Sequence, residues 1–312
     1  MEEQQIKQKE TLPENGEAED IKVTVTEKPK LKSKLIEYFE AVLFALLVAA
    51  FLKIFFVEAY RIPTGSMMNT LLVGDFLLVN KIVYGATTPR SIPFTQIRIP
   101  YFTFPTIQHP ERGDVVVFDY PGDINVFQSK EVTNFIKRLV GEPGDSIKIV
   151  DKVLYVNGEV FPNHPDALFS ESIEKSPNLG IFPPGSGWNN DNYGPIRVPQ
   201  KDDIIKITPD NMEAWKMFIM REGHSIRLTA DNKVFIDETE KSDYKVEKNY
   251  YFMMGDNRNN SSDSRYWGFL SEDRIIGEAL MIYWSWDPNI PYSNFGRLFD
   301  SIRWNRIAKI IH

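Results

Sequence analysis

The longest apolar run in the chain is Ala41–Val57 (AVLFALLVAAFLKIFFV), which carries a single charged residue, Lys53. At about 1.5 Å per residue, a helix of this length nearly crosses a hydrocarbon core of roughly 30 Å. Phe39 and Tyr60 stand at its two ends, where aromatic side chains favour the membrane–water interface. No small-residue cleavage site follows the run. The pattern therefore predicts a transmembrane helix over residues 36–58, in preference to a cleaved secretory signal or a buried core helix.

The segment before this run is polar. Residues 1–35 are rich in Glu, Lys, Gln and Thr, which predicts a disordered tail, because such a segment buries too little apolar surface to order itself. Four lysines come shortly before the apolar run: Lys28, Lys30, Lys32 and Lys34. Only Arg61 follows the run closely. By the positive-inside rule, the tail is cytoplasmic and everything after Val57 lies outside, which predicts a single-pass protein of the cell inner (cytoplasmic) membrane.

After the apolar run, short β-branched and aromatic segments alternate with turns. The predicted strands are Phe76–Val79, Val115–Asp119, Ile147–Val150, Val153–Val156, Ile226–Leu228, Val234–Ile236 and Tyr250–Met254. Asn157-Gly158 is a strong hairpin signal. One helix is predicted at Asp210–Arg221, after Thr208-Pro209 and before Gly223. Strands and helices do not alternate as in a parallel α/β fold, so the fold class is mainly β and antiparallel.

The composition of Phe161–Asn249, with many prolines, glycines and asparagines around the predicted helix, indicates a small α+β domain inserted into the β core. The core then comprises residues 59–160 and 250–312, and the insert residues 161–249.

Two other segments allow two readings each. Thr87–Pro110 is aromatic and Pro-rich, with Phe94 and Phe102 among its rings. It is either an irregular loop over the core or an apolar surface that dips into the membrane. Asn294–His312 mixes basic and apolar residues. It is either a short interfacial helix or a fraying terminus.

The amino-acid composition excludes several classes of partner and of active site. A net charge of -7 argues against a nucleic-acid partner, because no basic excess exists to meet phosphates. The absence of cysteine excludes a thiol nucleophile, disulfides and thiolate-bound metals. The four histidines lie far apart and form no H-E-x-x-H pattern: His109, His164, His224 and His312. We therefore expect neither a metal site nor a cofactor.

Ser66 follows Pro63-Thr64-Gly65, where the backbone bends sharply between the apolar run and the first predicted strand. It is a candidate nucleophile, although a serine in such a bend is commonly only a turn residue. A nucleophilic serine needs a base, and Lys137 is a candidate. In a strand it shares one face with Phe135 and Leu139, which would desolvate its amine and lower its pKa. A neutral amine can take a proton from a hydroxyl. The alternative is a strand lysine that extends to solvent.

A third polar cluster is GDNRNNSSDSRYWGFL at Gly255–Leu270. Tyr266-Trp267 should anchor it in the core, so its polar groups should form a hydrogen-bonded network. Asp263 and Arg265 are plausible partners in that network.

Four segments carry a resemblance to a known family: IPTGSM at Ile62–Met67, RGDVVVF at Arg112–Phe118, KRLVGEPGD at Lys137–Asp145 and GDNRNNSSDSRYWG at Gly255–Gly268. In order and spacing, and with the preceding apolar run, they resemble the motifs of bacterial type I signal peptidases (leader peptidases), a family of Ser-Lys dyad serine proteases. The resemblance covers roughly Ile36–Gly158 and Tyr250–Arg306. It implies an antiparallel β fold of the type shared by signal peptidases and SOS-repressor proteases.

The resemblance implies a role for each matching residue. Ser66 would be the nucleophile and Lys137 its general base. The Ser66 N–H and the Thr64 hydroxyl would form the oxyanion hole. The other implied site residues support this pair: Ser261 by a hydrogen bond to the Lys137 amine, Asp263 and Arg265 as a pair, Asp256 and Asn257 by holding the loop, and Met67 by packing. Three positions depart from the usual pattern without removing a catalytic group: Asn69, Asn259 and Glu142.

The expected function is that of a membrane-bound serine endopeptidase that removes signal peptides from exported preproteins after small residues (Ala-x-Ala). Its expected partners are those signal peptides, membrane lipids and, by proximity, the secretion translocon. A self-cleaving repressor-type protease would carry a DNA-binding head in place of the apolar run. A penicillin-binding type acyl enzyme is suggested only by Ser172–Lys175 and Ser242–Lys245, which match S-x-x-K without a Lys-Thr-Gly. The non-enzymatic alternative is a membrane-tethered β scaffold or chaperone.

Overall fold

The computed structural model describes residues 31–85, 87–88, 97, 99–123, 132–290 and 293–312. The chain divides into two compact units, Met1–Leu47 and Val48–His312. The predicted tail lies, up to residue 30, outside the described residues.

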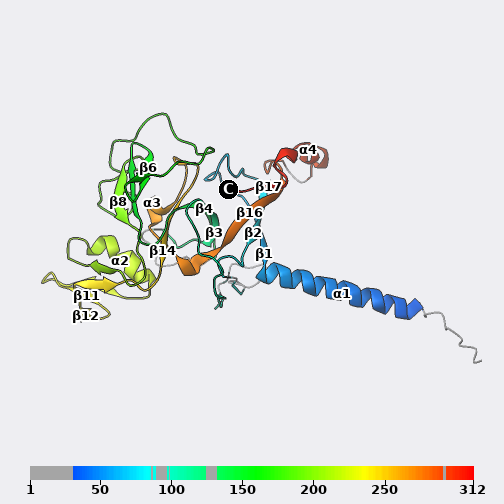
Figure 1. The fold of residues 1–312 in the computed structure, drawn as a ribbon, viewed down its shortest axis with the longest axis horizontal. Coiled ribbons are helices and arrows are strands. Elements are labelled where there is room, and N and C mark those ends of the chain that lie inside the picture. The colour runs from blue at the N-terminus through cyan, green and yellow to red at the C-terminus, as the bar shows by residue number, and fades with distance from the viewer. Residues whose placement is uncertain (1–30, 86, 89–96, 98, 124–131, 291–292) are drawn as a thin grey trace, which may run out of the picture. The chain divides into compact units, whose positions relative to one another are not determined.

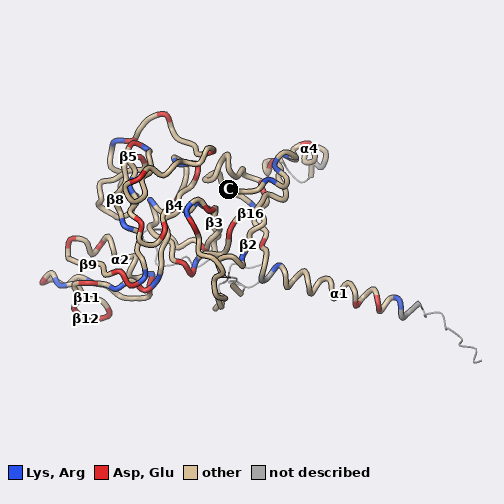
Figure 2. The backbone as a smooth tube through the Cα atoms, viewed as in Figure 1, with Lys and Arg blue, Asp and Glu red and all other residues tan. Residues whose placement is uncertain are grey.

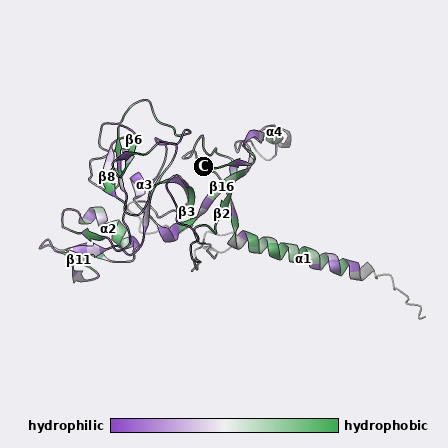
Figure 3. Ribbon diagram, in the orientation of Figure 1, coloured by the Kyte–Doolittle hydropathy of each residue, from purple (hydrophilic) through white to green (hydrophobic). Residues whose placement is uncertain are grey.

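Helix α1 spans Leu31–Phe55, and Figure 3 shows that most of its length is apolar. It ends at Phe55 because Val57–Arg61 already forms strand β1. Within it, Lys34–Lys53 comprises 20 residues, which at about 1.5 Å per residue span roughly 30 Å. By length and composition, this helix can cross a membrane.

The main sheet is antiparallel throughout, in the order β1-β2-β16-β3-β4-β14-β15, and β17 adds to β16 (Figure 1). Its strands are β1, β2 (Asp75–Asn80), β3 (Val115–Asp119), β4 (Asn134–Gly141), β14 (Tyr250–Met254), β15 (Leu270–Ser271), β16 (Ile275–Ser285) and β17 (Lys309–Ile310). Strand β16 pairs with β3 near its start and with β2 further along. Shifts of register, including one between Ala279 and Met281, mark irregularities that let one long strand bend between these neighbours.

Strand β3 is buried at every position because it separates two apolar clusters. Val115 and Val117 belong to the cluster that contains Met67. Val116 and Phe118 belong to the other cluster, with Leu139 and Trp267 among its members. Successive side chains of a strand point to opposite faces, so a continuous Val-Val-Val-Phe run can fill two cores at once. Strand β4 pairs with β3 and likewise contributes to both clusters, with Ile136 packed against the first and Leu139 in the second.

Smaller sheets and a helix complete the fold: the four-stranded sheet β7-β6-β5-β8, the three-stranded sheet β10-β11-β12, the pair β13-β9, and helix α2. Their bounds are β5 (Ser146–Val150), β6 (Val153–Val156), β7 (Glu159–Val160), β8 (Tyr193–Arg197), β9 (Ile204–Lys206), α2 (Met212–Arg221), β10 (Ile226–Leu228), β11 (Val234–Ile236), β12 (Thr239–Glu240) and β13 (Asp243–Lys245). Strand β8 lies in the predicted insert, yet it pairs with β5 of the predicted core. One apolar cluster also joins residues of both parts, among them Leu154, Ile236 and Phe252. The assignment of 161–249 as a separate domain stays a prediction.

Each of the predicted strands is present, and the predicted fold class, mainly antiparallel β with an N-terminal apolar helix, is confirmed. Asn157 and Gly158 turn β6 into β7 with φ values of 55° and 86°. Both are left-handed, as a type I′ hairpin turn requires. Helix α2 begins two residues later than predicted, with Asn211 before its first residue.

The C-terminal segment does not fray. It forms the short helix α4 (Phe295–Asp300), the 3₁₀ turn η2 (Trp304–Arg306) and strand β17. Arg306 Nη2 donates to Asp75 Oδ2 at 2.6 Å, and Asp75 is fully buried. A buried ion pair and the pairing of β17 with β16 hold this segment to the sheet, so the fraying alternative was wrong.

The aromatic segment Thr87–Pro110 is described only in part, and Phe94 lies outside the described residues. Thr87 pairs with Thr103 in an isolated bridge. Phe102 and Phe104 are exposed, so the choice between a covering loop and a membrane-dipping surface stays a prediction.

Basic and acidic residues are interspersed along the backbone drawn in Figure 2.

Candidate active site

Ser66 lies in the connection between β1 and β2. Gly65 O accepts from Met68 N at 3.1 Å, and Met67 O accepts from Leu71 N at 2.7 Å, so the chain turns tightly here. Met67 and Leu71 are fully buried in the cluster beneath. These two apolar side chains anchor the turn, and Ser66 itself keeps 8% of its surface exposed.

Lys137 reaches this turn from the middle of β4. Its Nζ is 2.7 Å from Ser66 Oγ and 3.0 Å from the carbonyl oxygen of Ile136. The Phe135 ring lies 5.1 Å from the amine, and Lys137 is 3% exposed. The two predicted residues therefore meet, and the alternative in which Lys137 extends to solvent is wrong.

Burial lowers the pKa of Lys137 from 10.5 to about 8, because the charged amine is stripped of water. The negative charges of Asp263 and Asp256 oppose this shift, and burial outweighs them. An amine with this pKa is neutral in an appreciable fraction of molecules near pH 7. It can therefore accept a proton from the hydroxyl with which it is in contact.

Asn257 fixes the two peptide planes on either side of Ser66. Its Nδ2 donates to Gly65 O at 3.0 Å, and its backbone N–H donates to Ser66 O at 3.0 Å. Gly65 O and the Ser66 N–H belong to one planar peptide unit, so the first bond also orients that N–H. Within the described residues, no hydrogen-bond partner is found for the Ser66 N–H or for the exposed Thr64 hydroxyl. The role of these two donors as an oxyanion hole stays a prediction.

Gly255 allows the loop to approach this closely. A Cβ at position 255 would lie 2.6 Å from Ser66 O and 2.1 Å from Ser261 Oγ. Backbone cannot yield to such a contact, so any side chain here would push the loop away from the serine turn. Met67 also contacts the loop, because its Sδ accepts from Asp256 N at 3.4 Å.

Asp263 and Arg265 form the predicted pair. Arg265 Nη2 donates to Asp263 Oδ2 at 2.8 Å and Nε donates to Oδ1 at 2.9 Å, with both residues almost fully buried. Burial alone would raise the pKa of Asp263, but the Arg265 charge and the hydrogen bonds hold it below its ordinary value. Asp263 also caps the short helix α3 (Ser264–Trp267) by accepting from Arg265 N.

The partner of Asp256 was missed from the sequence. Arg138 Nε and Nη2 donate to its two carboxylate oxygens at 2.9 and 2.8 Å, and Thr70 Oγ1 donates at 2.6 Å. Burial would raise the pKa of Asp256, yet Arg138 keeps it lowered. The Lys137-Arg138 dipeptide could have suggested a second buried ion pair. Alternation in a strand places the two side chains on opposite faces, so Arg138 needs a partner away from Ser66.

The predicted hydrogen bond between Ser261 and Lys137 is not formed. Ser261 Oγ is buried and makes no hydrogen bond to the Lys137 amine, whose two contacts go to Ser66 Oγ and Ile136 O. Ser261 nevertheless packs at Gly255, beside the Ser66 turn. Over the described residues, no three His, Asp or Glu side chains gather as metal ligands would.

The chain was compared with known families, proteins and structures. The model of the family described as "Signal peptidase, peptidase S26" matches residues 35–284. The signal peptidase I of Pseudomonas fluorescens is 33% identical over 289 residues, which cover 88% of this chain and 82% of that protein. That of Buchnera aphidicola subsp. Acyrthosiphon pisum is 34% identical over 295 residues, with 89% and 84% covered. A solved signal peptidase I from Enterococcus faecalis V583 is 20% identical, covers 55% of this chain and 98% of its own, and has a TM-score of 0.24.

The family match extends over most of the chain, and these two relatives exceed 30% identity over more than four fifths of their own length. The predicted class of enzyme, a serine endopeptidase, is thereby confirmed. The chain belongs to the signal peptidase family, peptidase S26.

Proposed function

We propose that this chain cleaves signal peptides from exported preproteins by nucleophilic catalysis, with Ser66 as the nucleophile and Lys137 as its general base. The observation that carries the proposal is the 2.7 Å contact between Ser66 Oγ and the buried Lys137 Nζ. Ser-Lys pairs are a known variant of the serine–base arrangement. No other hydroxyl contacts the Lys137 amine among the described residues.

In the first step, Ser66 Oγ attacks the scissile carbonyl carbon while its proton moves to the neutral Lys137 amine. The negative charge that forms on the carbonyl oxygen is stabilised by the Ser66 N–H, which Asn257 orients, and by the Thr64 hydroxyl. The protonated Lys137 then gives its proton to the departing amine, which leaves an acyl ester on Ser66. Water, deprotonated by Lys137, hydrolyses that ester and regenerates the serine.

Asp263, Arg265 and Asp256 are proposed to support this chemistry without touching the substrate. The pair Asp263–Arg265 and the pair Asp256–Arg138 each hold one end of the short segment that contains Asn257. Their charges are matched within the site, so neither pair leaves a free carboxylate in contact with the Lys137 amine.

The substrate is proposed to be the end of an apolar segment at the membrane, cut after small residues at positions -1 and -3. Only 11 positions separate Ser66 from Phe55, the last residue of α1, and that length of chain spans at most about 40 Å. The nucleophile is thus tethered near the end of the apolar helix. An extended substrate strand beside this turn is the expected mode of binding.

Ser66→Ala and Lys137→Ala test the assignment directly. With a purified preprotein and the detergent-solubilised full chain, each variant should cut at a rate lower by on the order of 10⁴-fold or more. Ser176→Ala and Lys148→Ala are the matched controls, because both side chains are exposed, and these should cut normally. Near-normal cleavage by either site variant would overturn the assignment. Replacing the -1 alanine of the preprotein by a bulky residue should stop cleavage by the native enzyme.

We also propose that the chain is anchored in the inner membrane, in contact with its lipids and near the translocon, and that its catalytic unit lies outside. The lysines that precede the apolar run support this orientation. The chain has no cysteine, so one introduced at an exposed position reports topology cleanly. Ser176→Cys should react with an impermeant maleimide applied to intact spheroplasts. Reaction only after lysis would contradict the orientation.

A further inference from the structure

A segment of the predicted insert, residues 163–172 (the strap), lies against the loop that holds the serine turn. Leu168 N donates to Asp256 O at 2.8 Å, and Arg258 N donates to Leu168 O at 2.9 Å. Leu168 therefore forms a parallel bridge with Asn257, the residue that orients both peptide planes at Ser66. The strap supports Asn257 from one side while Asn257 holds Ser66 on the other.

The strap is fastened to the loop by side chains as well. Asn259 Oδ1 accepts from Ser170 N at 2.7 Å, and Asn259 Nδ2 donates to Ser170 Oγ at 3.0 Å. Arg258 Nη1 donates to Asn163 Oδ1 at 2.7 Å, and the Arg258 guanidinium lies 5.6 Å from the Phe169 ring centre. A weaker contact reaches the serine turn itself, from Asn69 Nδ2 to Asp166 O at 3.3 Å.

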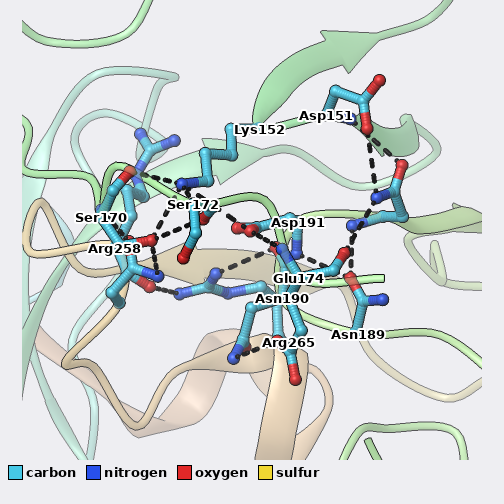
Figure 4. Close-up of polar contacts among 12 residues, drawn as sticks. Asp151, Lys152, Ser170, Ser172, Glu174, Asn189, Asn190, Asp191, Arg258 and Arg265 are labelled. Atoms are coloured by element: carbon cyan, nitrogen blue, oxygen red, sulfur yellow. Dashed lines mark hydrogen bonds and ion pairs between the residues drawn. The ribbon is translucent and has the colours of Figure 1, made fainter. Parts of the chain in front are cut away.

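Lys152 pins the far end of the strap, as Figure 4 shows. Its amine donates to Ser170 O at 2.5 Å, to Ser170 Oγ at 2.9 Å and to Ser172 O at 2.7 Å. Its Nζ is also 3.8 Å from Asp191 Oδ2, and the Lys152 side chain is 12% exposed. An ammonium has three donors, and all three are directed at the strap. The negative charge of Asp191 stabilises the Lys152 ammonium in this largely buried site.

We propose that Lys152 is a positioning residue for the Ser66–Lys137 pair, an inference that rests on the proposed function above. It acts through Ser170, Leu168 and Asn257 in turn. Without its amine, the Ser170 carbonyl loses its donor, Ser172 O keeps only the Ser170 hydroxyl as a donor, and Asp191 loses its cation. The strap then loosens, and Asn257 holds the Ser66 peptide planes less firmly.

The chain of contacts predicts which kinetic quantity changes. Asn257 orients the Ser66 N–H, the proposed oxyanion donor, which acts on the transition state more than on bound substrate. Loss of Lys152 should therefore lower kcat and leave KM nearly unchanged. The strap does not contact the Lys137 amine, so the pH at which activity rises should also stay where it is.

The experiment compares Lys152→Met with Lys175→Met, which removes an exposed lysine just beyond the strap. With the detergent-solubilised full chain and a preprotein, Lys152→Met should lower kcat about tenfold or more per active site, since displacements of ~1 Å can cost on the order of 100-fold. Active sites are counted by acylation of Ser66 with a serine-directed reagent. Lys152→Arg, which keeps a cationic donor, should recover part of the loss, and Lys175→Met should behave as native.

Asn259→Ala provides a second variant that breaks the strap from the loop side and serves if Lys152→Met folds poorly. If both residues act through the strap, the double variant should lose little more kcat than the worse single variant. Native kcat in Lys152→Met, or two losses that multiply, would overturn the inference. A loss explained entirely by fewer folded active sites would do the same. Cleavage by Ser66→Ala would instead overturn the proposed function, so the two failures are distinguishable.

Discussion

Lys137 and Arg138 are neighbours in β4 and are buried to the same degree, yet their basic groups meet different partners. Arg138 is 4% exposed and its guanidinium makes two hydrogen bonds to the Asp256 carboxylate. Lys137 is 3% exposed, and its amine contacts one hydroxyl and one carbonyl. The attraction of a carboxylate in direct contact offsets the desolvation free energy of a buried cation, whereas a hydroxyl and a carbonyl do not offset it.

This difference in partners explains why two consecutive basic residues serve different purposes. Arg138, whose guanidinium is paired with the Asp256 carboxylate, can act as a structural cation. The Lys137 amine can lose its proton, and burial brings that pKa to about 8. The alternation of the strand allows this division, since it points one side chain to Ser66 and the other to Asp256.

The largest effect that tests this comparison is on stability, with both residues changed to methionine. Arg138→Met leaves Asp256 buried without its cation, and the free energy of unfolding should fall by about 3–5 kcal/mol. Lys137→Met removes an amine that burial already disfavours as a charge, and the change should stay within about 1 kcal/mol. Urea unfolding of the detergent-solubilised full chain, followed by tryptophan fluorescence, measures both.

The native chain and Lys148→Met, at an exposed position of β5, are the references for that measurement. A cost for Lys137→Met as large as that for Arg138→Met would mean that the amine is a paired charge. The contrast between the two faces of β4 would then be lost, and with it the argument for a neutral base.

Local pattern was enough to nominate Ser66, Lys137 and the Asp263–Arg265 pair as candidates, and the resemblance to signal peptidases gave them their expected roles. A bend after Pro-Thr-Gly, a lysine between Phe135 and Leu139, and opposite charges two residues apart can each be recognised within a short window of sequence. Strands such as β3 were predicted for the same reason, because a β-branched and aromatic run next to a turn is a local signal. That Ser66 and Lys137 would meet required the sheet itself, which brings together residues 71 positions apart.

Contacts between distant polar residues could not be predicted from one sequence. Arg138 and Asp256 are 118 positions apart, and Asp75 and Arg306 are 231 apart. Alternation in β4 places Arg138 on the face opposite Lys137, but no local pattern identifies Asp256 as its partner or Arg306 as the partner of Asp75, because the pairing is decided by which strands become neighbours. For the same reason, the amphipathic composition of the C-terminal segment left a short helix and a fraying terminus both open, and the contact of Arg306 with Asp75 excludes the second.

The contrast between Lys137 and Arg138 also predicts a smaller effect, on the pH dependence of cleavage. The proton on Lys137 must be absent for Ser66 to be activated, so kcat/KM should rise roughly tenfold per pH unit below about 8 and level off above it. The folded pKa lies below the unfolded value of 10.5, so the unfolded chain binds more protons between these two values. This group should therefore make the protein more stable as pH rises from about 8 to 10.5. Rates on a neutral peptide substrate between pH 5 and 10 measure the first effect. A rate that keeps rising about tenfold per pH unit from pH 8 to 10, without levelling off, would show that the amine is solvated and would contradict the burial argument.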